Sequence, residues 1–150
     1  TVALAASIFG FFVGGKLIKS AGVKNSLIIG AFLVMITNLF FAYIAISEKS
    51  LALLSLVVAL DSMAAGIVGT VNITFLTSLV SKQYTAVQYA LFTSFMMLPG
   101  KILAGFSGLI IIKLGIVFGD DYGWMSFFII TSALTIPSIL LIRFYKDIYG

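Results

Sequence analysis

The sequence contains no cysteine and no histidine, and only 9% of its 150 residues are charged. The lack of cysteine excludes disulfides and thiol chemistry, and without either residue the usual zinc sites are excluded. A serine nucleophile would have no histidine to activate it. Soluble domains carry a charge on about 25% of their residues. This chain therefore has too few charges to cover the surface of a soluble domain.

What the sequence has in abundance is apolar side chains, which make up 61% of the residues and give a mean hydropathy of +1.21. A bilayer solvates such side chains directly, so the composition predicts an all-α, polytopic membrane helix bundle. The apolar runs do not alternate with period two, and most approach the roughly 20 residues that cross a bilayer. We expect one membrane domain, residues 1–150, with about five transmembrane helices at about 2–17, 27–46, 51–80, 86–116 and 124–142.

The connectors between these runs are short, so successive helices should run antiparallel. They are Ile18–Ser26, Ser47–Ser50, Ser81–Thr85 and Val117–Gly123. One side of the membrane would then hold most of the basic residues, namely Lys16, Lys19, Lys24, Lys82, Arg143 and Lys146, and the other Lys49 and Lys113. The excess of basic residues places the first side, with the C-terminus, in the cytoplasm. The net charge of +4 thus reflects topology, and we expect no nucleic-acid partner.

The chain begins at Thr1, directly inside an apolar run that has no charged leader and no cleavage site. A signal peptide is therefore not expected there. We interpret the sequence as the C-terminal part of a longer protein or as the product of a truncated gene.

Asp61 is the most informative single residue, because it interrupts the apolar run 51–80. A carboxylate in hydrocarbon is costly unless it is protonated, paired or facing water. We favour a proton-coupling or substrate-contacting role, with a structural ion pair as the alternative. Lys101, near the middle of the run 86–116, is the natural partner. Burial favours the neutral forms of Asp61 and Lys101, whereas an ion pair between them favours the charged forms. A site in which these two effects nearly balance would take up a proton as its surroundings change between wet and dry.

Helical spacing places further polar and small residues beside these two charges. Gly69 and Asn72 lie on the face of Asp61, while Ser94 and Gly105 lie on the face of Lys101. Each stripe predicts a cavity lining, in which Asn72 offers hydrogen bonds, or equally well a tight helix contact without a cavity.

Other residues predict mainly helix packing, with contact to a substrate as the less favoured alternative for Thr37 and Asn38. Thr37 and Asn38 are expected to form hydrogen bonds between helices. The spacing Gly10-Phe-Phe-Val-Gly14 favours close approach of two helix backbones in lipid. Pro99-Gly100 should bend the fourth helix, as in transporters that alternate between two states, and Pro137 should do so more mildly in the fifth.

Residues 14–24 resemble the loop signature of the major facilitator superfamily, through Gly15, Leu17, Gly22 and Lys24. Lys19 and Ser20 replace the Asp and Arg of that signature, so its gating ion pair cannot be transferred to this chain.

A second stretch, Lys-Gln-Tyr-Thr-Ala-Val-Gln-Tyr-Ala-Leu-Phe-Thr-Ser at 82–94, is similar to the AmpG muropeptide permeases. Further matches to that family are Gly100-Lys101 with Gly105, Gly123-Trp124 with Phe127, and Asp61 with Gly66 and Gly69. The resemblance implies helices 8 to 12 of a twelve-helix fold. It also implies proton-driven import of anhydro-muropeptides across a bacterial inner membrane, without enzymatic activity or a cofactor.

In that interpretation Asp61 exchanges the proton, Lys101 pairs with it or with an acidic group of the substrate, and Asn72 donates and accepts hydrogen bonds. The partners would be membrane lipid, protons, a small solute and the missing N-terminal half of the transporter. Two alternatives remain open: a non-transporting remnant or split-gene subunit, and a transporter for another solute such as an acyl-coenzyme or a sugar.

The composition makes a direct prediction about solubility. After expression and cell lysis, the chain should sediment with the membranes and enter solution only with detergent, because water does not solvate its apolar segments. Recovery of the intact product in the aqueous fraction without detergent would contradict the membrane assignment.

Overall fold

The computed structural model describes residues 2–48, 50–80 and 85–144, and within these ranges every regular element is a helix. The helices are α1 (Val2–Ile46), α2 (Leu51–Leu79), α3 (Thr85–Phe118), α4 (Asp120–Ala133) and α5 (Thr135–Phe144). Four stretches are long and apolar enough to cross a membrane: α1, α2, α3 from Ala86 onward, and α4 together with α5. The prediction of an all-α polytopic membrane bundle is confirmed.

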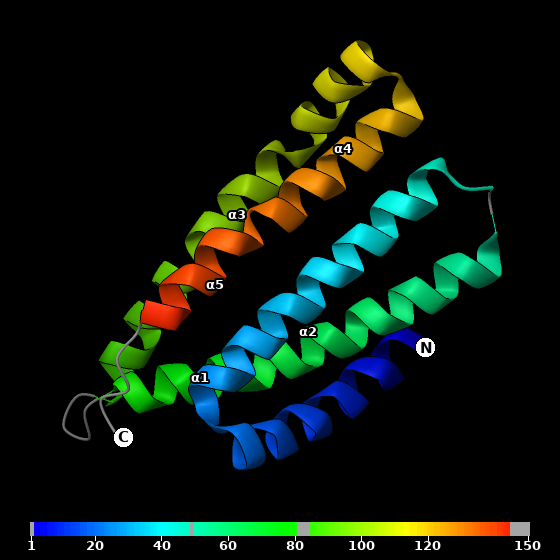
Figure 1. Cartoon of the computed structure of the whole chain (residues 1–150). Helices are drawn as coiled ribbons and strands as arrows, with labels where there is room; N and C mark the ends of the chain where they lie inside the picture. The colour runs from blue at the N-terminus through cyan, green and yellow to red at the C-terminus, as the bar shows by residue number, and fades with distance from the viewer. Residues whose placement is uncertain (1, 49, 81–84, 145–150) are drawn as a thin grey trace.

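The longest of these helices, α1, consists of two helices that meet at Gly22, whose backbone has φ 77° and ψ 166°. Glycine adopts this positive φ without a steric penalty. The chain reverses direction there, so α1 contributes two passes and the bundle has five among the described residues (Figure 1). The predicted connector Ile18–Ser26 is wrong in extent, because helix continues on both sides of Gly22. Lys24 accordingly lies within helix rather than in a loop, and Gly15 lies within helix as the predicted run 2–17 has it.

The connector Ser47–Ser50 lies between α1 and α2 as predicted, whereas the connector before the last pass differs from the prediction. Residues 117–123 were expected to form a loop, but Gly119 alone, with φ 93°, separates α3 from α4. The last pass breaks at Leu134. This break lies where the Pro137 ring would clash with the carbonyl four residues earlier, on Ala133. By contrast, α3 continues through Pro99 without interruption. Lys49 and residues 81–84 lie outside the described residues.

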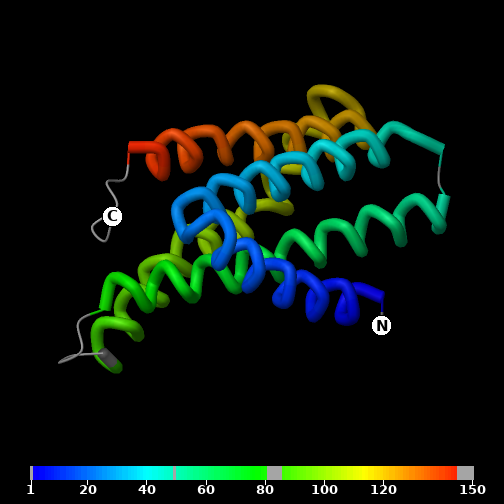
Figure 2. Tube along the Cα trace, turned by 60° about the horizontal axis from the view of Figure 1, so that its bottom comes forward, coloured from blue at the N-terminus to red at the C-terminus, as the bar shows by residue number. Residues whose placement is uncertain are grey.

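The ends of the helices group at two opposite ends of the bundle. The break in α1 and the ends of α2 and α5 lie together, while the N-terminus, the connection from α1 to α2 and the turn from α3 to α4 lie at the other end (Figures 1 and 2). Successive passes are therefore antiparallel, as the short connectors predict. Which end faces the cytoplasm stays a prediction, and Lys82 and Lys146 lie outside the described residues.

The helices α1 and α2 pack closely, and their backbones meet at glycines. A methyl group added at Gly66 would lie 3.1 Å from the Cα of Gly10 and would overlap the carbonyl oxygen of Ser7. A methyl group at Gly14 would lie 3.0 Å from the carbonyl oxygen of Ile67. The Gly10–Gly14 spacing thus forms the predicted backbone contact, which small residues permit in lipid.

The remaining helices pack around α1, which contacts α2, α4 and α5. The exception is α3, which packs mainly against α4 and scarcely touches α2. None of the described α3 side chains is buried. The core of the bundle therefore lies between the second half of α1, α2 and α4, and α3 forms its outer edge.

The backbone contact predicts a large effect of a single methyl group. Gly66→Ala should destabilise the bundle by about 1–3 kcal/mol, because the helices must separate to accommodate it. Gly15→Ala is the matched control, since nothing lies within 4 Å of its added methyl group. It should be neutral or slightly stabilising, because alanine favours helix. Unfolding by sodium dodecyl sulfate from dodecyl maltoside micelles measures both, and equal effects would contradict the contact.

Candidate functional site

A carboxylate and a hydroxyl meet at the interface of α1 and α2. The Oγ1 of Thr37 donates a hydrogen bond to Oδ1 of Asp61 over 2.9 Å and also lies 3.1 Å from the carbonyl oxygen of Val34. Thr37 is only 5% exposed, and Asp61 is half-buried. Because one hydroxyl has one proton, these two acceptors share it. Asp61 is thus held at the helix interface by a neutral donor.

The next residue of α1 faces a different helix. Asn38 donates from Nδ2 to the carbonyl oxygen of Val34 over 3.0 Å, and its Oδ1 lies 3.4 Å from the donating Oγ1 of Thr131 on α4. The buried Ser132 donates to the carbonyl oxygen of Met35 over 3.1 Å. Hydrogen bonds between helices were predicted for Thr37 and Asn38, and both are confirmed.

Aromatic rings extend this contact between α1 and α4. Phe41 stacks on Phe128 with ring centroids 5.3 Å apart, and Trp124 stacks on the same ring at 6.1 Å. Stacked rings add to the stability that burial alone provides. The polar contacts of α1 are therefore set in a well-packed interface.

Lys101 does not meet Asp61. Within the described part of the chain no ion pair joins them, and Thr37 is the hydrogen-bond partner of the carboxylate. Lys101 is exposed on α3, where it lines a hollow of about 300 Å³. All the lining residues of this hollow belong to α3: Thr93, Ser94, Met97, Leu98 and Lys101. The predicted pair is separated because α3 packs against α4 instead of α2.

The other predicted residues of the fourth run share this exposed position. Ser94 donates to its own helix, at the carbonyl oxygen of Ala90. Pro99 is exposed, and methyl groups added at Gly100 or Gly105 would meet nothing within 4 Å. This stripe of α3 therefore makes no tight helix contact within the described residues.

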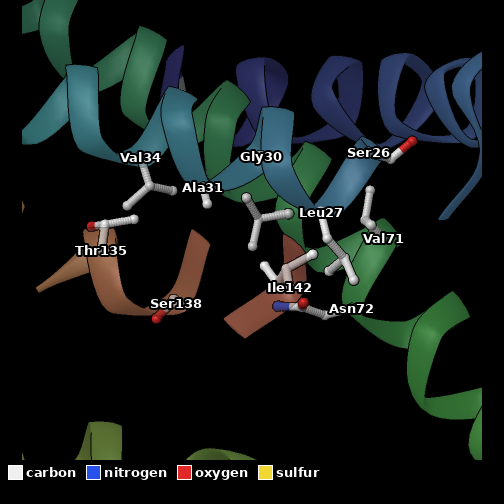
Figure 3. A pocket seen from close by; sticks show the side chains of 11 residues that line it. Ser26, Leu27, Gly30, Ala31, Val34, Val71, Asn72, Thr135, Ser138 and Ile142 are labelled. Carbon is white, nitrogen blue, oxygen red and sulfur yellow. The ribbon is translucent and has the colours of Figure 1, made fainter. Parts of the chain in front are cut away.

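Asn72 lies in a cavity of about 290 Å³ between α1, α2 and α5 (Figure 3). The lining residues are Ser26, Leu27, Gly30, Ala31, Val34, Val68, Val71, Asn72, Thr135, Ser138 and Ile142. Gly69 was expected beside Asn72, but a methyl group there would point at the ring of Phe11, 3.6 Å away. The second and third runs thus line a cavity at Asn72, whereas at Gly69 the third run contacts the first run.

The sequence prediction missed the contribution of the last pass. Thr131, Thr135 and Ser138 lie on one helical face, and two of them line the cavity. Their spacing of four and then three residues is visible in the sequence and would have indicated this polar face. No group of three acidic side chains that would hold a metal ion occurs in the described ranges.

The fold and these contacts define a polytopic membrane protein with an acidic side chain at depth between two helices. Comparison with curated proteins identifies its relatives. It is 28% identical to "Putative transporter AmpG 1" of Rickettsia felis over 91% of this chain and 29% of that protein. The protein of the same name from Rickettsia bellii is 28% identical over 94% of this chain and 32% of its own length.

A third relative, "Putative transporter AmpG 4" of Rickettsia conorii, is 26% identical over 94% of this chain and 32% of its own length. The chain spans about a third of the length of these relatives. No protein-family profile matches the chain, and no solved structure matches it. The resemblance to AmpG-type permeases that the sequence motifs indicated is confirmed by these curated relatives.

A double-mutant cycle tests the contact between Thr37 and Asp61. The variants Thr37→Val, Asp61→Leu and their combination should give a coupling energy of about 0.5–2 kcal/mol, the range for hydrogen bonds between membrane helices. Unfolding in mixed micelles measures it. Thr74→Val replaces Thr37→Val in the control cycle, because Thr74 donates to its own helix at Thr70. The contact is refuted when both cycles give the same coupling.

Proposed function

We propose that the chain is the C-terminal part of a major facilitator transporter that imports anhydro-muropeptides together with protons across a bacterial inner membrane. The observation that carries this proposal is the similarity, over more than nine-tenths of the chain, to relatives that are named as AmpG transporters. These names also point to a protein that moves a solute rather than to an enzyme. Proton coupling and the solute rest on further arguments from the described residues.

The hydrogen bond between Thr37 and Asp61 supports proton exchange at this carboxylate. In the charged state Asp61 accepts a hydrogen bond from the Thr37 hydroxyl, whose oxygen lies 2.9 Å from Oδ1. In the neutral state the carboxylic acid becomes a donor, and the hydroxyl oxygen is an available acceptor. The hydroxyl proton then turns fully to the carbonyl oxygen of Val34, 3.1 Å away. Both protonation states are thus satisfied by a small rotation of one hydroxyl.

Lys101 would bind an acidic group of the solute. A lysine in the middle of a membrane-spanning helix requires an acidic partner or water. Within the described residues Asp61 does not supply that partner, and the hollow around Lys101 is open. In our proposal a carboxylate of the solute pairs with Lys101, while Asn72 exchanges hydrogen bonds with uncharged groups.

The chain spans about a third of its relatives, so the complete transport path requires a further membrane segment as partner. Alternating access involves two packed halves, and the five passes described here resemble part of one such protein. In the proposed topology the C-terminus lies in the cytoplasm, because the basic residues Lys16, Lys19 and Arg143 lie toward that end of the bundle.

Uptake of labelled anhydro-muropeptide tests the proposal in a bacterial strain that lacks its own permease. The gene would be expressed with its full upstream reading frame. Asp61→Asn should reduce uptake by about tenfold or more, which corresponds to about 1.4 kcal/mol, and should remove its dependence on external pH. Lys101→Met should reduce uptake similarly, and Lys101→Arg should restore part of it because the charge is retained.

Asp120→Asn is the matched control, because this exposed carboxylate lies at the turn between α3 and α4. It should leave uptake unchanged. Normal uptake and pH dependence in both Asp61→Asn and Lys101→Met would contradict the assigned roles. Uptake of an acyl-coenzyme or a sugar in place of the muropeptide would instead reassign the solute. No uptake of any of these by a chain that reaches the membrane would favour a non-transporting remnant.

A further inference from the structure

Two cavities adjoin at the end of the bundle that contains the break in α1. The first, the polar chamber, is the 290 Å³ cavity that contains Ser26, Asn72, Thr135 and Ser138. The second, the apolar chamber, has a volume of about 360 Å³ and is lined by Phe75, Leu76, Met96 and Leu141. Leu27, Asn72 and Ile142 belong to both linings. Each volume is near the lower end of the range for small-molecule pockets, about 300–1,000 Å³.

Two side chains of the polar chamber lack a hydrogen-bond partner among the described residues. Ser26 donates to the carbonyl oxygen of Gly22 over 2.6 Å, and Thr135 donates to that of Thr131 over 3.4 Å. Neither Asn72 nor Ser138 has any such partner within the described part of the chain. Figure 3 shows the Asn72 amide beside Ile142, with Ser138 farther along the same lining. Polar groups in a membrane interior require a hydrogen-bond partner, so the side chains of Asn72 and Ser138 are available to bind a ligand.

The lining residues also indicate the charge of the ligand that would bind there. Among the described residues no charged side chain lines either chamber, so an ionic group would lose its hydration without compensation from them. An asparagine amide and a serine hydroxyl both donate and accept, which suits hydroxyl or carboxamide groups. The polar chamber is therefore suited to an uncharged, hydrogen-bonding head group.

The apolar chamber indicates the route by which a ligand with such a head group reaches the site. Leu141 is 73% exposed and Met96 is 44% exposed, so the outer rim of this chamber consists of exposed apolar side chains. In a bilayer such a rim meets hydrocarbon. An alkyl chain therefore enters the apolar chamber from the lipid, and its head group comes to lie beside Asn72.

We propose that the two chambers form one binding site for an uncharged amphiphilic lipid, with hydroxyl or carboxamide groups in the polar chamber and an alkyl chain in the apolar chamber. This site shares Asn72 with the proposed solute contacts, but it contains none of the residues that line the hollow at Lys101. Its test does not require transport activity. Within it, Asn72 and Ser138 hold the head group, while Leu141 and Met96 contact the chain.

Photo-crosslinking in nanodiscs tests the proposal with the purified chain. The probe is a monoacylglycerol whose alkyl chain carries a diazirine, and the comparison probe has the same chain without hydroxyl groups. After illumination, peptide mass spectrometry should locate the monoacylglycerol on the residues of the apolar chamber. Asn72→Leu and Ser138→Ala should each reduce this labelling by about fivefold relative to the hydroxyl-free probe, because the head group loses its hydrogen bonds.

Ser55→Ala is the matched control, because Ser55 lies outside both chambers and donates a hydrogen bond to its own helix at Leu51. It should label like the native chain. Unfolding in mixed micelles should show the native midpoint for each variant. If Asn72→Leu does not fold, Asn72→Gln replaces it, and because this variant preserves the amide it should label like the native chain. Equal labelling by the two probes, or no effect of either substitution, would overturn the proposal. So would displacement of the probe by millimolar glycerol or N-acetylglucosamine, which would identify a water-soluble ligand instead of a lipid.

Discussion

The structure depends on one constraint: in hydrocarbon, a polar side chain finds its partner within the protein or has none. Most serines and threonines of the described residues meet it locally, by donating to a carbonyl oxygen three or four residues earlier in their own helix, as Ser62 and Thr74 do. A few side chains reach across to another helix. Thr37 joins α1 to α2, and Ser132 joins α4 to α1. These few contacts determine which faces of the central helix meet which neighbours.

The close backbone contacts and these polar contacts lie on different parts of α1. Its first half approaches α2 through Gly10 and Gly14, where the absence of side chains brings the two backbones together. Its second half joins α2 through Thr37 and α4 through Asn38. The single residue Gly22 makes this division possible, because it reverses the chain and places both halves against α2. The same constraint draws attention to Lys101, Asn72 and Ser138, whose side chains have no hydrogen-bond partner within the described ranges.

Much of the fold follows from the sequence alone. The apolar runs predict the passes because the bilayer sets their length, and Gly10–Gly14 predicts a close contact because that spacing repeats on one helical face. The extent of the break at Gly22 was not predictable, since it depends on a single backbone angle. The pairing of Asp61 with Lys101 was expected because their helices are consecutive. Helical periodicity predicts which residues share a face of a helix, but it does not predict which helix packs against that face. Because α3 packs against α4, Lys101 does not reach Asp61. The partner of Asp61 proved to be Thr37, a neutral residue from the preceding pass.

The attachment of α3 has a mechanical consequence. This helix is held to the bundle mainly through α4, and near the turn at Gly119 the two backbones are so close that a methyl group at Gly123 would lie 2.8 Å from the Cα of Gly115. Lys101 lies 18 residues before Gly119 (119 − 101), or roughly 27 Å along the helix axis. A helix fixed at one end acts as a lever, so a tilt of about 10° at the turn would carry the lysine through an arc of about 5 Å, while the contacts of α1 with α2 stay in place.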